Sequence, residues 1–530
     1  MKTIFTNGKI YTFNKNEPFV EAIVTNGERI EDLGSYQDMK LAWGSSDTRI
    51  VDLGGKAVLP GLIDSHLHIS SVGITSLELD LTGVKSKDDL LQRIKFKAET
   101  LQPGEWILGR GWDENIFPDK KIPVINELDY VAPGNPLFLP RVCGHAFLAN
   151  SKAFEIAGYH DELSVPFGGT VVKDEYNQPN GLLLETASNI ITSHIPKMTY
   201  AHLKKALSLG MQESVRLGLT GIHTNDPTYL YGVNQTYKLF DEIVNMEGIG
   251  PRSNLLIDYQ YLDELKEAGM YAGYGNNKVM IGAIKFFADG ALGGRTAHLS
   301  KEYADDPGNF GSAIYEKEQL FRYFQECRDY DMPIAVHTIG DHALTDVLDI
   351  LDRMEPVRFR DRLIHVSLLN EELIKRLKSP HRIVDLQPKF VSSDFPWIVD
   401  RIGEERAKFA YPFKTLLDNG VICAGSSDAP IEPLNPLLGI HAAVTRRKEG
   451  ETHGGYIEYE KLSMYEAIEM FTLGGAFATN EEHEKGSLER GKLADMTVLS
   501  NDPFTMDSPD ELIDTEVELT IIGGEVKFQK

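Results

Sequence analysis

Segments with the pattern of buried strands alternate with helix-like segments through the middle of this 530-residue chain. The helix-like segments repeat apolar residues every three or four positions, as a helix that packs on one face does. Alternation of this kind predicts parallel strands joined by helical connections, and eight such strands predict an α/β fold, the (β/α)8 TIM barrel. The helix candidates are 201–217, 317–330, 343–354 and 371–377. The strand candidates are 56–63, 219–224, 253–259, 281–287, 334–337, 363–366, 383–386 and 421–426.

The two ends of the chain have a different pattern, with short strand-like segments joined by glycine turns. Asn7-Gly8 predicts a hairpin between 3–6 and 9–13, and Asn26-Gly27 predicts a second turn. Neither end is long enough to bury a core of its own. We therefore predict one small β-sandwich built from residues 1–57 and 485–530, with the barrel formed by 58–69 and 216–484.

Residues 70–215 lie between the first and second barrel strands and are far too many for a loop. They contain a helix candidate at 87–101 and an apolar strand at 136–139. We predict an inserted subdomain of mixed α/β structure. Because it leaves from the carboxyl end of strand one, we expect it to lie over the mouth of the barrel.

The composition excludes some classes of partner. A net charge of −25 and a pI near 5.1 argue against nucleic acid and anionic membranes. No apolar run approaches the roughly 18 residues of a membrane helix. The three cysteines, Cys143, Cys327 and Cys423, are far apart and odd in number, which fits a reducing compartment. With no signal-peptide pattern at the start, we expect a cytoplasmic protein. The oligomeric state is left open, with a homo-oligomer as one alternative.

Polar residues stand where the predicted strands end, which is where barrels place their active sites. His66 and His68 follow strand one and, two residues apart on a strand, point to the same side. Taken singly, each residue has an ordinary explanation, such as a core histidine, a surface lysine or a turn aspartate. Together they predict a metal site at the carboxyl ends of strands one, four, five, six and eight. The predicted ligands are His66, His68, Lys285, His337, His365 and Asp428.

Two motifs make the chain resemble the amidohydrolase superfamily of metal-dependent hydrolases along nearly its whole length. One is Pro-Gly-Leu-Ile-Asp-Ser-His-Leu-His at 60–68, and the other is 486–491 followed by Ala494-Asp495. Further segments resemble the branch that contains N-substituted formamide deformylases. These segments are 285–290, 337–341, 387–388, 425–430 and 443–446.

The resemblance implies a binuclear centre. In it, Lys285 is carboxylated by CO2 and bridges two metal ions, while His337 and His365 bind the second ion. One departure is Arg362, three residues before His365, because relatives often carry a glutamate before that histidine. This puts in doubt a contact behind the ligand and leaves the ligand itself unaffected.

Chemistry follows from this ligand set. Imidazole and carboxylate ligands suit two Zn ions best, although Mn or Fe fit the same set. Two such ions can share a hydroxide that attacks a carbonyl carbon. Asp428 would take the proton and return it to the leaving amine. We predict hydrolysis of a non-peptide C–N bond (amide, N-acyl or N-formyl) in a small-molecule substrate.

Two other functions are kept as alternatives. A heterocycle deaminase of the same superfamily would usually carry a glutamate on strand five, which 337–341 lacks, and would leave Lys285 unexplained. A non-catalytic scaffold would have lost ligands, whereas all six positions carry ligating residue types.

The substrate pocket is the least constrained part of the sequence. Ordinary packing is an alternative for the aromatic candidates, a structural role for His145 and a surface ion pair for Arg295. The candidates for substrate binding are Trp112, His145, Asp289, Arg295 and Gln387, with Phe287 and Trp397 beside them.

Overall fold

The computed structural model describes residues 2–142, 145–158, 165–166 and 168–530. Contacts divide the chain into two compact units. Residues 1–71 and 210–530 form one, and 72–209 form the other. Of the cysteines, Cys327 and Cys423 are buried free thiols, and Cys143 lies outside the described residues. None of the described helices is long and apolar enough to cross a membrane.

Eight parallel strands form the centre of the first unit, and each pairs with the strand that follows it in the chain. Beyond the last strand, His68 N donates to Ala429 O at 2.8 Å, which sets the end of the sheet beside its beginning. This arrangement is an α/β TIM-like barrel, as predicted. The strands are β6 (Leu62–Leu67), β13 (Leu219–Asn225), β14 (Arg252–Asp258), β15 (Val279–Phe287), β16 (Ile334–Thr338), β17 (Asp361–His365), β18 (Arg382–Leu386) and β19 (Cys423–Gly425).

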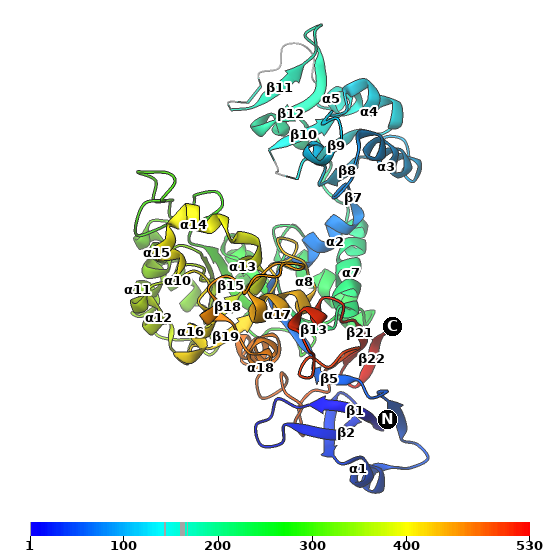
Figure 1. Cartoon of the computed structure of the whole chain (residues 1–530), viewed down its shortest axis with the longest axis vertical. Helices are drawn as coiled ribbons and strands as arrows, with labels where there is room; N and C mark the ends of the chain where they lie inside the picture. The colour runs from blue at the N-terminus through cyan, green and yellow to red at the C-terminus, as the bar shows by residue number, and fades with distance from the viewer. Residues whose placement is uncertain (1, 143–144, 159–164, 167) are drawn as a thin grey trace. The chain divides into compact units, whose positions relative to one another are not determined.

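Helices in the intervals between these strands cover the outside of the barrel, as Figure 1 shows for α10 (Lys317–Arg328), α11 (Asp341–Leu351) and α12 (Glu371–Leu377). Helix α11 shows why such segments are helical. Its apolar residues recur at helical spacing, and Leu344, Val347 and Leu351 are buried. All three helices lie where the sequence predicts them, to within a few residues at their ends.

The predicted single strand at 56–63 proves to be parts of two strands. Strand β5 (Ala57–Pro60) belongs to the sheet of the chain ends, and β6 belongs to the barrel. Gly61 separates them, and a Cβ there would lie 2.1 Å from Thr220 Oγ1, so only glycine fits. Both strands are buried, so an unbroken apolar run does not mark the point where the chain changes sheet.

Both ends of the chain contribute to one eight-stranded sheet with the order β22-β21-β20-β5-β1-β2-β3, in which β4 also pairs with β1. Its core is formed by fully buried side chains such as Phe5, Ile23, Val58 and Ile521. A two-layered sandwich stays a prediction. The remaining strands are β1 (Lys2–Tyr11), β2 (Phe19–Asn26), β3 (Arg29–Gly34), β4 (Arg49–Asp52), β20 (Met496–Leu499), β21 (Val517–Ile522) and β22 (Glu525–Gln529).

The predicted hairpin at Asn7-Gly8 is wrong, because β1 runs straight through it. Residues on both sides of Asn7 pair with the same strand β2, and the register shifts between Thr6 and Ile10. Asn7 has a positive φ of 57° and its Nδ2 donates to Asp52 at 2.6 Å. Asn-Gly therefore forms a bulge here, since a residue with positive φ fits a bulge as well as a turn. The second turn, at Asn26-Gly27, does join β2 to β3.

The second unit contains both helices and strands. It holds a six-stranded sheet with the order β11-β12-β10-β9-β8-β7 and a core of its own. Its position over the barrel mouth stays a prediction. Its main elements are β7 (Leu79–Asp80), α3 (Lys87–Glu99), β8 (Ile107–Arg110), α4 (Ile125–Val131), β9 (Leu137–Pro140), β10 (Ala146–Ala149), α5 (Ser151–Ile156), β11 (Thr170–Lys173) and β12 (Pro179–Leu184).

Candidate metal centre

Three of the predicted ligands meet where the last barrel strand returns to the first. His66 is in β6, His68 directly follows it, and Asp428 follows β19. Asp428 Oδ1 lies 3.4 Å from His66 Nε2 and 3.5 Å from His68 Nε2. One ligand atom from each residue lies within 4.8 Å of the others, the spacing of a group that can hold a metal ion.

Lys285 lies beside this group, near the end of β15. Its Nζ is 3.3 Å from His66 Nε2 and 4.9 Å from the centre of the Phe287 ring. The side chain is buried, and the described residues provide no carboxylate in ion-pair contact with it. Burial lowers the pKa of Lys285 to about 8. A buried lysine without an ion partner is unusual, which indicates a chemical role for its nitrogen.

His337 and His365, from β16 and β17, form the next part of the cluster. Their ring centres are 4.5 Å apart, and the ring of His365 is 5.7 Å from that of His66. These two histidines are neighbours of the His66–His68–Asp428 group without belonging to it. The structure thus brings all six predicted ligands to one end of the barrel.

Hydrogen bonds orient three of the four imidazole rings and leave the other nitrogen of each for a cation. His68 Nδ1 lies 2.8 Å from Asn225 O, and His337 Nε2 lies 3.1 Å from Gly290 O. His365 Nδ1 lies 2.8 Å from Gln387 Oε1. Histidines that bind metals in proteins are held in this way. Gln387, proposed from the sequence as a substrate-binding residue, therefore contacts a predicted ligand directly.

The electrostatics of the cluster also suit a cation. Burial lowers the pKa of His365 to about 4 and holds the pKa values of His66 and His337 well below the usual value. These rings are therefore neutral at pH 7, the form that binds metals. Burial would raise the pKa of Asp428, but the hydrogen bond with His68 and nearby positive charges bring it below its usual value. Burial would lower the pKa of His68, but the same hydrogen bond with Asp428 raises it, so a metal ion would displace a proton there. An ionised carboxylate and imidazoles are the donor set of a zinc-type site.

Asp64 is a buried carboxylate that the sequence analysis did not select. Its Oδ1 accepts from the main-chain N–H of His66 and of Ser427, both at 3.1 Å. It therefore ties the strand that carries the histidines to the segment that carries Asp428. Burial raises its pKa to about 7. The sequence signal that could have identified Asp64 is its position two residues before His66.

Arg362, the departure from the family pattern, lies inside the barrel beneath the cluster. Its Nε donates to Asp385 Oδ2 at 2.8 Å, and another guanidinium nitrogen donates to Ser65 O. Both side chains are buried. The charge is thus paired within the barrel, and His365 is oriented by Gln387 instead.

Asp289 and Arg295 are occupied by contacts of their own. The Asp289 carboxylate accepts main-chain hydrogen bonds from His298, Ile339 and Gly340 at 2.7–3.0 Å and is buried. Arg295 donates to Asp305 at 2.8 Å, the ion pair foreseen as its alternative role. Substrate binding by either residue stays a prediction.

Trp112 and His145 belong to the inserted unit. Trp112 is fully buried in the core of that unit, and its Nε1 donates to Leu139 O at 2.8 Å. This matches the packing alternative. His145 is exposed, and its Nδ1 lies 2.9 Å from a Glu185 carboxylate oxygen.

Aromatic side chains stand beside the ligands within the first unit. Phe287 is 39% exposed and its ring centre is 5.4 Å from that of His337. Tyr229, which the sequence analysis did not select, is 41% exposed with its ring centre 5.8 Å from that of His68. Trp397 donates to Ser393 O at 2.9 Å and stacks near Arg401. The partly exposed rings of Phe287 and Tyr229 give the centre an apolar border.

Comparison with known proteins identifies the family of this chain. The model of the family described as "Amidohydrolase family" matches residues 49–528. The chain belongs to the amidohydrolase family. This amidohydrolase is 39% identical to the putative amidohydrolase YtcJ of Bacillus subtilis (strain 168) over 532 residues, which cover 100% of both chains.

Two further relatives bear on its chemistry. The N-substituted formamide deformylase of Arthrobacter pascens is 26% identical over 553 residues, covering 99% of this chain and 98% of the relative. The crystal structure of an uncharacterized metal-dependent hydrolase from Pyrococcus furiosus superposes with a TM-score of 0.78 at 30% identity, covering 95% of this chain and all of that one. This amidohydrolase is therefore a hydrolase of a metal-dependent family.

Proposed function

We propose that this amidohydrolase cleaves a non-peptide C–N bond in a small molecule, an amide, N-acyl or N-formyl group. The observation that carries the proposal is the convergence of His66, His68 and Asp428 on one point, with the buried Lys285 beside it. A formamide deformylase among the full-length relatives supports the choice of bond. The cytoplasmic location and the oligomeric state stay predictions.

The residues of the centre fit divalent metal ions. His66, His68 and Asp428 would hold one ion, and His337 and His365 a second. When bound, such ions, for which Zn is the simplest choice, would activate water and polarise the scissile carbonyl group. The remaining roles in the reaction belong to side chains of the protein.

Lys285 would complete the centre as a carbamate. Its pKa of about 8 leaves part of the amine neutral near pH 7, and a neutral amine can add to CO2. The nitrogen forms a bond to the carbon of CO2 and releases a proton to solvent. The product replaces the buried amine by a carboxylate next to His66, so the side chain becomes an anion that could help to hold divalent cations.

Asp428 would move the proton. Its carboxylate is ionised at neutral pH and lies at the centre of the cluster, so it can accept a proton from the attacking water and donate it to the leaving nitrogen. The backbone of Asp428 is held by the hydrogen bond from its N–H to His66 O, so little reorganisation is needed for this role.

The border of the centre suggests the kind of substrate. Phe287 and Tyr229 present partly exposed rings next to His337 and His68. An apolar or aromatic group next to the scissile bond would lie against them and exclude water from the reacting atoms. We therefore place N-acyl and N-formyl derivatives of apolar amines and amino acids first among the substrates to test.

A hydrolysis screen with metal analysis of the same sample tests the proposal. The compounds are N-acyl amino acids, N-formyl amines and cyclic amides, with amine release as the readout, and Asp428→Asn is the matched inactive control. We expect release of amine that depends on bound metal and is lost in the control. Correctly folded protein that contains no metal would instead support the scaffold alternative. Release of ammonia from heterocycles would support the deaminase alternative.

A further inference from the structure

A cavity lies at the end of the barrel opposite the candidate metal centre. Its volume is about 520 Å³, within the range of small-molecule sites. Residues 421–423, at the amino end of β19, line it, whereas Asp428 follows the carboxyl end of that strand. Cys423 is the first residue of this three-residue strand, and none of the predicted metal ligands lines the cavity. The cavity is therefore distinct from the metal centre.

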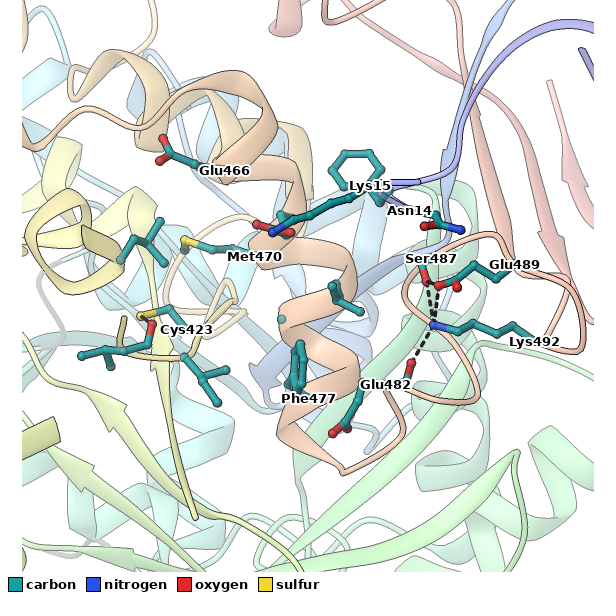
Figure 2. A pocket seen from close by; sticks show the side chains of 17 residues that line it. Asn14, Lys15, Cys423, Glu466, Met470, Phe477, Glu482, Ser487, Glu489 and Lys492 are labelled. Carbon is teal, nitrogen blue, oxygen red and sulfur yellow. Dashed lines mark hydrogen bonds and ion pairs between the residues drawn. The ribbon is translucent and has the colours of Figure 1, made fainter. Parts of the chain in front are cut away.

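Its walls come from both parts of the first unit. The loop that connects β1 to β2 provides Phe13 and Lys15, and the barrel provides the turn before β19 and the helical segments from 464 to 478. In Figure 2 the Lys15 side chain extends from its loop toward the helix that carries Met470. The cavity thus lies between the sheet of the chain ends and the barrel.

The floor of the cavity is apolar, with Ile422, Met470, Leu473 and Phe477 among its lining side chains. Met470 and Leu473 belong to a π-helical turn, Met470–Gly474. Turns of this kind occur often at functional sites. A floor of this composition suits the apolar body of a ligand.

Most charged groups on the walls are already paired with protein groups. Glu466 lies 2.7 Å from Lys414, and Glu482 lies 2.7 Å from Arg360. Lys492 contacts Glu489 at 2.9 Å, and the dashed lines in Figure 2 mark its bonds. These four wall groups, Glu466, Glu482, Glu489 and Lys492, are therefore not available for the strongest contacts with a ligand.

Two charges of opposite sign remain on the walls. Within the part of the chain that the structure describes, neither the Lys15 ammonium nor the Glu469 carboxylate has a hydrogen bond or ion pair. Glu469 is half-buried, and burial raises its pKa although the positive charge of Lys15 opposes this. The two groups are thus close enough to act on each other without being in contact. A molecule that carries both charges next to each other would satisfy both.

We infer that this cavity binds a free α-amino acid with an apolar side chain, such as leucine or phenylalanine. Glu469 pairs with the α-ammonium group, Lys15 pairs with the α-carboxylate, and the side chain lies on the floor formed by Ile422, Leu473 and Phe477. The inference does not depend on the proposed function, because it uses no residue of the metal centre.

Calorimetric titration of the full chain with L-leucine and L-phenylalanine tests the inference. Hexylamine, hexanoate and N-acetyl-L-leucine are the comparison ligands, since each lacks one of the two charges. We expect saturable binding of the amino acids with one site per chain, and binding at least about threefold weaker for the comparison ligands. Hexylamine that binds as tightly as leucine would overturn the assignment to an amino acid.

Two substitutions locate the site. Glu469→Gln keeps the shape of the side chain and should weaken leucine binding roughly tenfold, because Glu469 is half-buried. Lys15→Met changes an exposed residue and should weaken it about threefold. Glu404→Gln and Lys95→Met, at exposed positions elsewhere, are the matched controls and should change nothing.

The same titration separates the cavity from the metal centre. The His66→Ala/His68→Ala double variant should bind leucine as the unaltered protein does, whatever its activity. Binding that is lost in this variant, or that is unchanged in both Glu469→Gln and Lys15→Met, would overturn the inference. A complete lack of binding by the unaltered protein would overturn it as well.

Discussion

The main-chain N–H of Asp428 donates a hydrogen bond to the carbonyl oxygen of His66, with an N–O distance of 2.8 Å. This bond joins the segment after the last barrel strand to the first strand. It fixes the Asp428 backbone, which has a positive φ of 58°, so that the carboxylate faces both His66 and His68. The same hydrogen bond therefore joins the two ends of the barrel sheet and holds the three candidate ligands together.

Asp428→Asn should abolish most of the activity and leave the fold intact, because the amide cannot accept the proton. General acid–base groups contribute ~10²–10⁴-fold, so we expect kcat to fall by about that factor. For the unaltered enzyme, the pKa of Asp428 lies below its usual value, so its carboxylate stays ionised at neutral pH and its protonation should reduce activity only on the acidic side of the profile. The pH–rate profile measures this, and a fully active Asp428→Asn enzyme would show that the proton takes another route.

Replacement of His66 and His68 together by alanine should remove most of the bound metal, since two of the three closest ligand atoms are lost. Metal analysis of the purified variant is the measurement, with one to two divalent ions per chain expected for the unaltered protein. The double variant His381→Ala/His483→Ala removes two exposed histidines and is the matched control. Full metal occupancy without His66 and His68 would contradict the site.

Carboxylation of Lys285 should depend on pH. The pKa of Lys285 is about 8 in the metal-free protein, so its reactive neutral form is half-populated at that pH and falls about tenfold for each unit below it. At a fixed CO2 pressure, metal uptake and recovery of activity should therefore increase as the pH rises toward about 8. A time course of reactivation measures the effect, and intact-mass analysis under non-acidic conditions should detect the added CO2. Lys285→Arg should show neither response.

Gln387→Leu should weaken metal binding without removing a ligand. Gln387 holds the His365 ring through a 2.8 Å bond to Nδ1, and loss of such a partner typically costs about 10–100-fold in metal affinity. Competition with a chelator measures the affinity, and activity at saturating metal should recover largely. Gln325→Leu, on the exposed face of α10, is the control. Equal affinities in the two variants would mean that the Gln387 contact is incidental.

Arg252→Met should destabilise the first unit strongly. Arg252, at the start of β14, forms two hydrogen bonds with Asp495, at 2.8 and 3.1 Å, and both side chains are buried. Removal of one partner leaves an unpaired buried charge, which costs about 3–5 kcal/mol in the free energy of unfolding. Arg216→Met, which breaks an exposed pair with Glu213, should cost at most about 1 kcal/mol. Urea unfolding measures both, and the double variant Arg252→Met/Asp495→Leu should recover part of the loss.

The sequence determined the elements of the barrel because the periodicity of apolar residues is a local property. Strands β13 to β19 and the helices α10, α11 and α12 lie where the pattern predicts them. The meeting of the six candidate ligands could be predicted for a related reason. Parallel strands bring their carboxyl ends together, so polar residues at those ends converge without any knowledge of tertiary contacts.

Predictions from the local sequence pattern were wrong where the same residues are compatible with two different local structures. Asn7-Gly8 fits a bulge as well as a turn, and pairing of both halves of β1 with β2 decided for the bulge. The apolar run before His66 fits one strand or two, and the close approach of Thr220 to Gly61 marks the change of sheet.

Only the tertiary structure decided which polar groups have partners. Arg295 lies against Asp305, and Trp112 lies in the core of the insertion, although both resembled substrate-binding residues in the sequence. In contrast, Glu469 and Lys15 have no distinctive sequence signal, and they became notable only as uncompensated charges on a shared cavity. The physical reason is that hydrogen bonding and desolvation depend on distances between residues far apart in the chain, whereas secondary structure depends on neighbours.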